Sequence, residues 1–140
     1  MSTRAVVLDA TPLSAAGRKG KRVQAWLVAA QRHSVPLHVS TVSFAEAFTG
    51  APTDAGLHRL LRALTVIEVT QAIGIRAGEL RTAGSSVRRK PRDLTVDSIV
   101  VATAEAIGGP VVILTGDPDD MDLLVGSRHK PVGDITVEGL

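Results

Sequence analysis

The chain has 140 residues, the length of one ordinary domain, and we expect residues 1–140 to form a single domain. It contains no cysteine, which excludes disulfides, cysteine zinc sites, iron–sulfur clusters and thiol catalysis. Hydrophobic residues make up 44% and charged residues 21%, a globular balance. No apolar run is as long as a membrane span, and the N-terminal apolar run is too short for a signal peptide. We therefore expect a cytoplasmic protein with no membrane contact.

The charges are clustered, although the formal net charge is only +2. One basic group is Arg18, Lys19, Lys21 and Arg22, and a second is Arg88, Arg89, Lys90 and Arg92. A basic run is most often a solvated surface, but two runs beside a carboxylate site favour a polyanionic substrate. Aromatic residues make up 2%, which argues against binding of single strands by rows of stacking rings.

The first half of the chain alternates strand and helix patterns. Residues 5–8 are a continuous apolar run, typical of a strand buried on both faces. Residues 21–32 place apolar side chains at helical spacing, and Pro36 follows. A short strand is expected at 37–39, and then a helix capped by Thr41 and closed by Gly50.

The second half continues this alternation. The expected elements are a weak helix at 55–63, a strand at 66–69, a helix from Thr70 to about residue 83, a basic loop at 84–92, a helix from Thr95 to Gly108, a strand at 111–114, a helix from Asp117, and an edge strand at 135–137. Strands separated by helices in this way predict a parallel sheet with helices on both faces. The fold class is therefore an α/β sandwich.

Acidic residues stand where two of the expected strands end. Asp9 directly follows the first strand, and Asp117 lies just past the strand at 111–114. Sites in open parallel sheets form at the carboxyl ends of the strands, where the strand order reverses. These acids will converge if the two strands are neighbours. The alternatives are local: Asp9 could accept turn amides, and Asp117 before Pro118 could cap a helix.

Two more acids interrupt apolar helices. Asp97 shares a helix face with Val101 and Ala104, and Glu46 stands within the helix around Phe44. An ionised carboxylate on an apolar face is costly unless it is paired or binds a metal. Asp97 could instead be a first-turn acid and Glu46 a surface residue. Taken together, oxygen ligands without histidine or cysteine favour Mg²⁺ or Mn²⁺.

Three segments resemble the acidic motifs of PIN-domain nucleases, above all VapC-type toxins of type II toxin–antitoxin systems. They are VVLDATPL, TVSFAEAF and LTVDSIVVATAEAIGGPVVILTGDPDDM. The resemblance extends from Asp9 to Asp120 and implies a PIN-like three-layer α/β/α sandwich with a mainly parallel central sheet. The chain departs from these proteins at Gly116, where relatives often have Asn or Ser, and at Met121, near a position often filled by Phe.

The resemblance also implies the roles of individual residues. The catalytic, metal-binding acids would be Asp9, Glu46, Asp97 and Asp117, with Asp119 as an auxiliary ligand, directly or through water. Thr11 and Thr115 match hydroxyl positions that support the site. We expect the basic group Arg88, Arg89, Lys90 and Arg92 to contact RNA phosphates, because it directly precedes the helix that carries Asp97.

The acids predict a metal-activated water, and the resemblance implies that it serves a metal-dependent endoribonuclease that cleaves RNA. By resemblance it would be the toxin of a toxin–antitoxin pair, with a cognate antitoxin as partner and a homodimeric assembly. The alternatives are a housekeeping PIN nuclease in RNA processing and a PIN-like binding module without catalysis. A receiver-like phosphoacceptor domain fits less well, since the chain lacks an early acidic pair and a convincing partner lysine.

Overall fold

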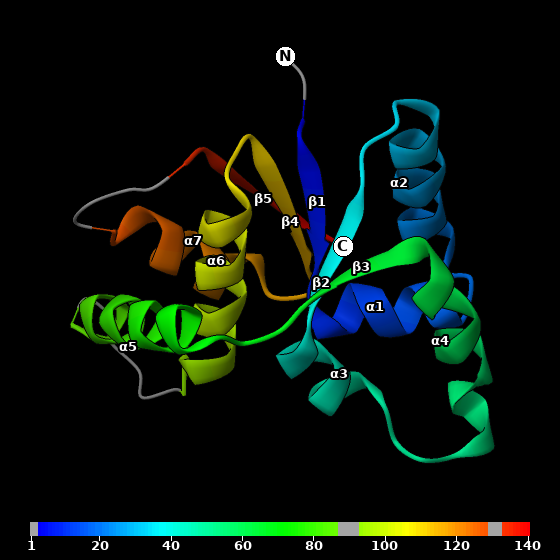
Figure 1. The fold of residues 1–140 in the computed structure, drawn as a ribbon, viewed down its shortest axis with the longest axis horizontal. Coiled ribbons are helices and arrows are strands. Elements are labelled where there is room, and N and C mark those ends of the chain that lie inside the picture. Colours follow the sequence, from blue (N-terminus) through cyan, green and yellow to red (C-terminus); the bar gives the residue numbers. More distant parts are fainter. Residues whose placement is uncertain (1–2, 87–92, 129–132) are drawn as a thin grey trace.

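The sheet has five strands, all parallel, in the order β3-β2-β1-β4-β5. The computed structural model describes residues 3–86, 93–128 and 133–140. The strands are β1 (Ala5–Leu8), β2 (Leu37–Ser40), β3 (Leu64–Ile67), β4 (Val111–Thr115) and β5 (Ile135–Gly139). The chain builds one half of the sheet outward from β1, then crosses back to add β4 on the other side of β1 (Figure 1).

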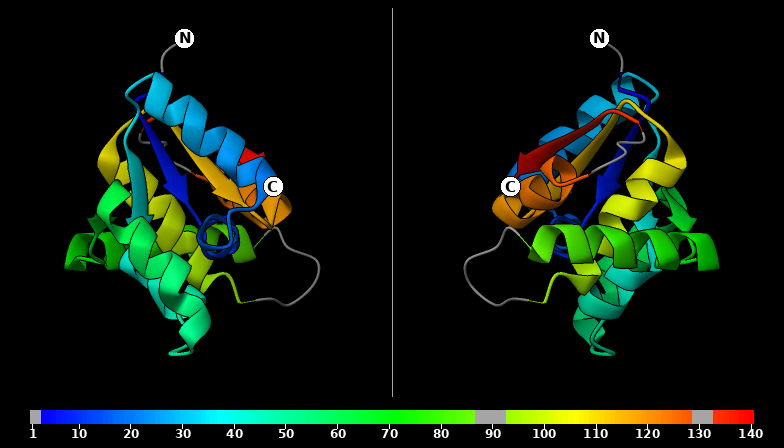
Figure 2. Two further views of the ribbon diagram at one scale, coloured as in Figure 1. Left: turned by 90° about the vertical axis from the view of Figure 1, so that its right-hand side faces the viewer. Right: turned by 90° about the vertical axis from the view of Figure 1, so that its left-hand side faces the viewer.

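Helices cover both faces of this sheet, which confirms the α/β/α sandwich expected from the sequence (Figure 2). They are α1 (Ala10–Gly17), α2 (Lys21–Arg32), α3 (Thr41–Ala47), α4 (Ala55–Leu60), α5 (Gln71–Ser85), α6 (Thr95–Ile107) and α7 (Pro118–Gly126), with short 3-10 turns η1 (Pro52–Asp54) and η2 (Leu61–Ala63). None of the helices in these described segments is both long enough and apolar enough to cross a membrane.

The two faces of the central strands belong to two separate apolar cores. Ala5 and Val7 of β1 pack with α5, α6 and α7, whereas Val6 and Leu8 pack with α1 and α4. This division follows from the alternation of side chains along a strand. All four β1 residues are buried because helices lie on both sides. The apolar run that predicted a doubly covered strand is thus explained.

The structure differs from the sequence expectations in several local details. The helix expected to be closed by Gly50 ends at Ala47. Residues 10–17 form α1, which the sequence analysis did not expect because this segment has little amphipathic pattern. The third strand is Leu64–Ile67 rather than 66–69, since pairing of Leu37 with Leu64 sets its register. The cap of α3 is Ser40, whose hydroxyl accepts from the Val42 amide, whereas the Thr41 hydroxyl accepts from the Val69 amide.

Two neighbouring strands bring distant parts of the chain to one edge of the sheet. β1 pairs with β4 along the whole length of β1, and Leu8 lies opposite Leu114 at the carboxyl end of β1. The amide of Asp9 continues this pairing by donating to the Leu114 carbonyl at 2.9 Å. The strand order reverses between these two strands, so the candidate site lies where open α/β sheets place their ligands.

Candidate metal centre

Asp9 is held in place by two hydrogen bonds. Its Oδ1 accepts from the Ala10 amide at 2.9 Å and so caps α1, and its Oδ2 accepts from the Thr115 hydroxyl at 2.9 Å. The Thr115 Oγ1 also accepts from the Asp117 amide at 3.0 Å. Thr115 is fully buried and Asp9 is 7% exposed. One hydroxyl thus connects the ends of β1 and β4 and orients the first acid.

Three carboxylates converge beside this point. One oxygen each from Asp97, Asp117 and Asp120 lies within 4.8 Å of the other two. Asp97 stands in the first turn of α6, Asp117 directly precedes α7, and Asp120 stands in the first turn of α7. The Asp117 side chain does not cap α7, so the capping role considered from the sequence is not the one it has here.

The donor set fits a hard divalent cation. All three side chains offer carboxylate oxygens, which are the ligands Mg²⁺ and Mn²⁺ prefer, and no sulfur or imidazole takes part in this group. The oxygens come from two helices and from the loop after β4, which places them around a common point rather than along one surface. Asp97, Asp117 and Asp120 are therefore the residues best placed to hold a metal ion.

Asp120 is a member of this group that was not predicted from the sequence. The auxiliary ligand predicted there was the neighbouring Asp119. The side chain of Asp119 is exposed, whereas Asp120 is only 4% exposed. Asp117 and Asp120 are three residues apart, which puts them on one face at the start of α7, and Leu124 continues that face into the core. This spacing was the signal in the sequence that could have favoured Asp120 over Asp119.

Glu46 belongs to the same region but lies at its surface. It stands on α3 and is exposed. Partial desolvation raises the pKa of its carboxyl group, and the negative charge of Asp9 raises it further. Within the described residues, Glu46 is not part of the group formed by the three aspartates.

The contact between Thr11 and the loop after β4 explains why glycine stands at position 116. Thr11 lies in the first turn of α1, and its side chain faces the loop after β4. A Cβ atom at Gly116 would lie 2.8 Å from the Thr11 Cγ2, which is too close for any larger residue without a shift. Glycine at this position therefore allows α1 and the loop to approach each other.

The basic group Arg88, Arg89, Lys90 and Arg92 lies outside the described residues, so the structure does not locate it. Of the residues named from the sequence, Asp97 and Asp117 come together, and Asp9 and Thr115 are joined by a hydrogen bond beside them. Glu46, Thr11 and Asp119 have exposed side chains, and the carboxylate group contains neither Glu46 nor Asp119.

Solved structures share this fold, although no protein-family model and no curated protein sequence matches the chain. A chain of the toxin–antitoxin complex from Klebsiella pneumoniae is 21% identical, with a TM-score of 0.61 over 83% of this chain and 89% of that one. A chain of VapBC2 from Rickettsia felis, bound to a promoter DNA fragment, is 15% identical. Its TM-score is 0.64, and the match covers 96% of this chain and 98% of that one. A chain of FitAcB from Neisseria gonorrhoeae is 15% identical. Its TM-score is 0.62, and the match covers 94% of this chain and 96% of that one.

These matches cover nearly the whole chain, so the likeness concerns the complete fold rather than one βα unit. Identities of 13–21% carry no information about individual residues, and the site described above rests on the geometry of this chain alone. The all-parallel sheet and its two helical layers agree with the fold expected from the acidic motifs. In its fold, the chain is a PIN-like three-layer α/β/α sandwich, similar to that of chains in the VapBC and FitAB structures.

Proposed function

We propose that the chain is a metal-dependent endoribonuclease and the toxin of a toxin–antitoxin pair. The observation that carries this proposal is the convergence of Asp97, Asp117 and Asp120 beside Asp9, at the edge of the sheet where the strand order reverses. The fold shared with VapBC and FitAB complexes supports the same function.

The acids have distinct roles in this proposal. Asp97, Asp117 and Asp120 hold the cation, and Asp9 completes its surroundings in an orientation set by Thr115. Glu46 and Asp119 border the site from the surface, and Thr11 supports the loop that carries Asp117.

A bound Mg²⁺ or Mn²⁺ would supply a water of lowered pKa and neutralise charge on the phosphate. The chain itself contributes the carboxylates that retain the ion, and these same groups repel RNA phosphates at short range. Cationic side chains must therefore hold the RNA strand. The group Arg88, Arg89, Lys90 and Arg92 precedes α6 and is the first candidate for this role.

The proposal includes a cognate antitoxin and a homodimeric assembly in the cytoplasm. Three of the similar structures are described as complexes of VapBC or FitAB proteins with DNA, and another as a toxin–antitoxin complex. An arginine or lysine from an antitoxin tail could pair with the acids and compete with the metal by charge and occupancy.

Cleavage of RNA by the purified chain, without antitoxin, tests the nuclease directly. We expect total cellular RNA to be cut in the presence of Mg²⁺ or Mn²⁺ and to remain intact in excess chelator. Asp97→Asn should reduce cleavage by at least about 100-fold, because asparagine keeps the shape of the side chain but removes a charge that binds the metal.

Asp122→Asn is the matched control, since Asp122 is an exposed acid of α7 outside the carboxylate group. It should cut RNA like the parent chain. A folded Asp97→Asn variant with parental activity would refute the proposed mechanism. A parent chain that binds RNA without cutting it under any metal condition would instead favour the binding module.

A further inference from the structure

The first basic group takes no part in the site described above, although the structure shows where it lies. We propose that Arg18, Lys19, Lys21 and Arg22, named here the corner patch, bind RNA phosphates of the substrate strand outside the carboxylate centre. This inference rests on the proposed nuclease function. It adds a second contact region for the same substrate, separate from the loop that precedes α6.

All four side chains of the corner patch are exposed. Unlike Arg76 and Arg128, which both pair with Glu105, none of them forms an ion pair in the part of the chain that the structure describes. Residues 10–45 contain no aspartate or glutamate, so no acid within this segment offsets the charge. The patch is thus a concentrated and uncompensated positive surface.

The positions of these cationic residues do not stabilise the helices. Lys21 and Arg22 stand in the first turn of α2, where positive charge opposes the helix dipole. Lys19 has a φ of 59°, a left-handed conformation that costs energy in any residue other than glycine. Such an unfavourable backbone conformation is a reason to look for function.

The turn between α1 and α2, from which the corner patch extends, is also tightly packed. α1 ends in a tight turn in which the amides of Arg18, Lys19 and Gly20 donate to carbonyls of α1. The end of α1 is pressed against α4 so closely that a Cβ atom at Gly56 would collide with the Gly17 carbonyl. The backbone positions of the four residues are therefore fixed relative to one another, and their exposed side chains can adjust to an extended anion.

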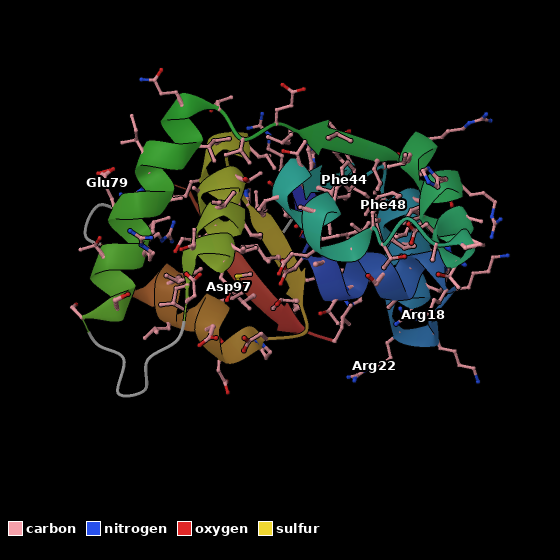
Figure 3. The ribbon with its side chains drawn as sticks, turned by 90° about the horizontal axis from the view of Figure 1, so that it is seen from below. Arg18, Arg22, Phe44, Phe48, Glu79 and Asp97 are labelled. Carbon is pink, nitrogen blue, oxygen red and sulfur yellow. The ribbon has the colours of Figure 1, made fainter. Side chains whose placement is uncertain are left out.

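The corner patch is connected to the candidate metal centre by a single helix. α1 begins at its cap Asp9 and ends next to Arg18, which is a span of about 12 Å for eight residues. Viewed from below, Arg18 lies at the end of α1 away from Asp97, and Arg22 lies below α1 on the same side of the picture as Arg18 (Figure 3). A strand whose scissile phosphate lies at the acids can extend along α1 to the patch.

RNA is favoured over an acidic peptide by the composition of the patch. Its four members are all cationic, and it contains no apolar anchor of the kind on which protein interfaces depend. Phosphate binding, in contrast, needs only positive charge and is insensitive to sequence.

Binding of a fluorescent 20-nucleotide single-stranded RNA tests the corner patch. The measurements use chains that also carry Asp97→Asn, so that binding is read without cleavage. Arg18→Gln/Arg22→Gln should weaken RNA binding roughly tenfold and reduce the salt slope by about one to two units. In the cleavage-competent chain the same pair should raise KM and leave kcat unchanged, because the patch is remote from the reacting phosphate.

Arg4→Gln/Arg32→Gln is the matched control. It removes the same two charges from exposed arginines at the opposite edge of the sheet, just before β1 and at the end of α2. It should leave both the dissociation constant and the salt slope unchanged. Lys19→Asn/Lys21→Gln is an independent second pair in the patch, to be used if the first pair lowers the thermal midpoint.

Equal effects of the patch pair and the control pair would overturn the proposal, since they would report only the net charge. Unchanged RNA binding with a loss confined to duplex DNA of the same length would overturn it as well. If the parent chain fails to cut RNA, the nuclease function falls, while the binding comparison still decides whether the corner patch contacts RNA.

Discussion

Thr115 shows how one buried hydroxyl organises the candidate site. Its Oγ1 donates to Asp9 and accepts from the Asp117 amide, so a single side chain sets the positions of two acids from different strands. Burial of this hydroxyl costs little free energy because both its donor and its acceptor form hydrogen bonds. Loss of either partner leaves a buried polar group without a hydrogen bond.

Thr115→Val tests this role, because valine has nearly the same shape and lacks the hydroxyl. We expect the free energy of unfolding to fall by about 1–3 kcal/mol and the affinity for Mn²⁺ to fall by about 10- to 100-fold. Denaturant unfolding and calorimetric titration measure the two effects. Thr136→Val, at an exposed position of β5, should change neither quantity. Unaltered Mn²⁺ affinity in folded Thr115→Val would contradict the positioning role.

Asp54 stabilises the connection between α3 and α4. Its carboxylate accepts from the Thr49 amide at 2.9 Å, from the Thr49 hydroxyl at 2.9 Å and from the Gly50 amide at 2.8 Å. The amide of Thr49 contributes most to lowering the pKa of Asp54 below its ordinary value, with help from the Thr49 hydroxyl and the Gly50 amide. The folded state therefore favours the charged form.

Asp54→Ala should lower the thermal midpoint at pH 7. A carboxyl group with a lowered pKa stabilises the fold above its unfolded value of about 3.9 and loses this effect as the pH falls through the folded value. The difference between parent and variant should thus shrink on acidification below about pH 4. Thermal melts between pH 7 and pH 3 measure it, with the exposed Asp122→Ala as control. A difference independent of pH would show that the charge is not responsible.

At the scale of elements, three helices on one face of the sheet are joined through Glu105. Arg76 of α5 donates to this residue of α6 at 2.7 and 3.1 Å, and Arg128, just beyond α7, donates at 3.3 Å. The side chains of Glu105 and Arg128 are 4% and 7% exposed. α6 and α7 are thereby tied near their C-terminal ends, while Asp97, Asp117 and Asp120 meet near their N-terminal ends.

Glu105→Gln should lower the free energy of unfolding by about 3–5 kcal/mol, because it removes the negative partner of a buried ion pair and leaves positive charge in the interior. Denaturant unfolding measures this change. Glu79→Gln removes an exposed carboxylate of α5 (Figure 3) and should cost less than about 1 kcal/mol. Equal costs for the two variants would mean that burial does not strengthen the Glu105 interactions.

At the scale of the whole molecule, the proposed activity has a consequence for the cell. An unrestrained ribonuclease damages its host, so expression of the chain alone should arrest growth, and co-expression of its antitoxin should restore growth. Asp97→Asn at equal protein level should not arrest growth. Growth curves with quantified expression test this expectation. If neither the parent nor Asp97→Asn affects growth, the toxin assignment fails, and RNA cleavage in vitro still decides the nuclease assignment.

The sequence by itself determined the features that depend on local pattern. Residues close in sequence determine three such features. They are the apolar run at β1, the amphipathic spacing of α2, and Gly108, which ends α6 with a positive φ. The alternation of strands and helices then led to a covered parallel sheet, and the acids at the strand ends led to the candidate site. Asp9 and Asp117 were singled out as acids at strand ends, and Asp97 as an acid on an apolar helix face.

Only the tertiary structure decided which of these features meet. The pairing of β1 with β4 brings Asp9 to Thr115 across more than a hundred residues of chain, and no local pattern contains that information. The choice of Asp120 over Asp119 depends on the rotation of α7 against α6, which is set by packing of the apolar core around Met121 and Leu124. Side-chain types and spacings are local properties, whereas a metal centre requires that distant oxygens share one point in space.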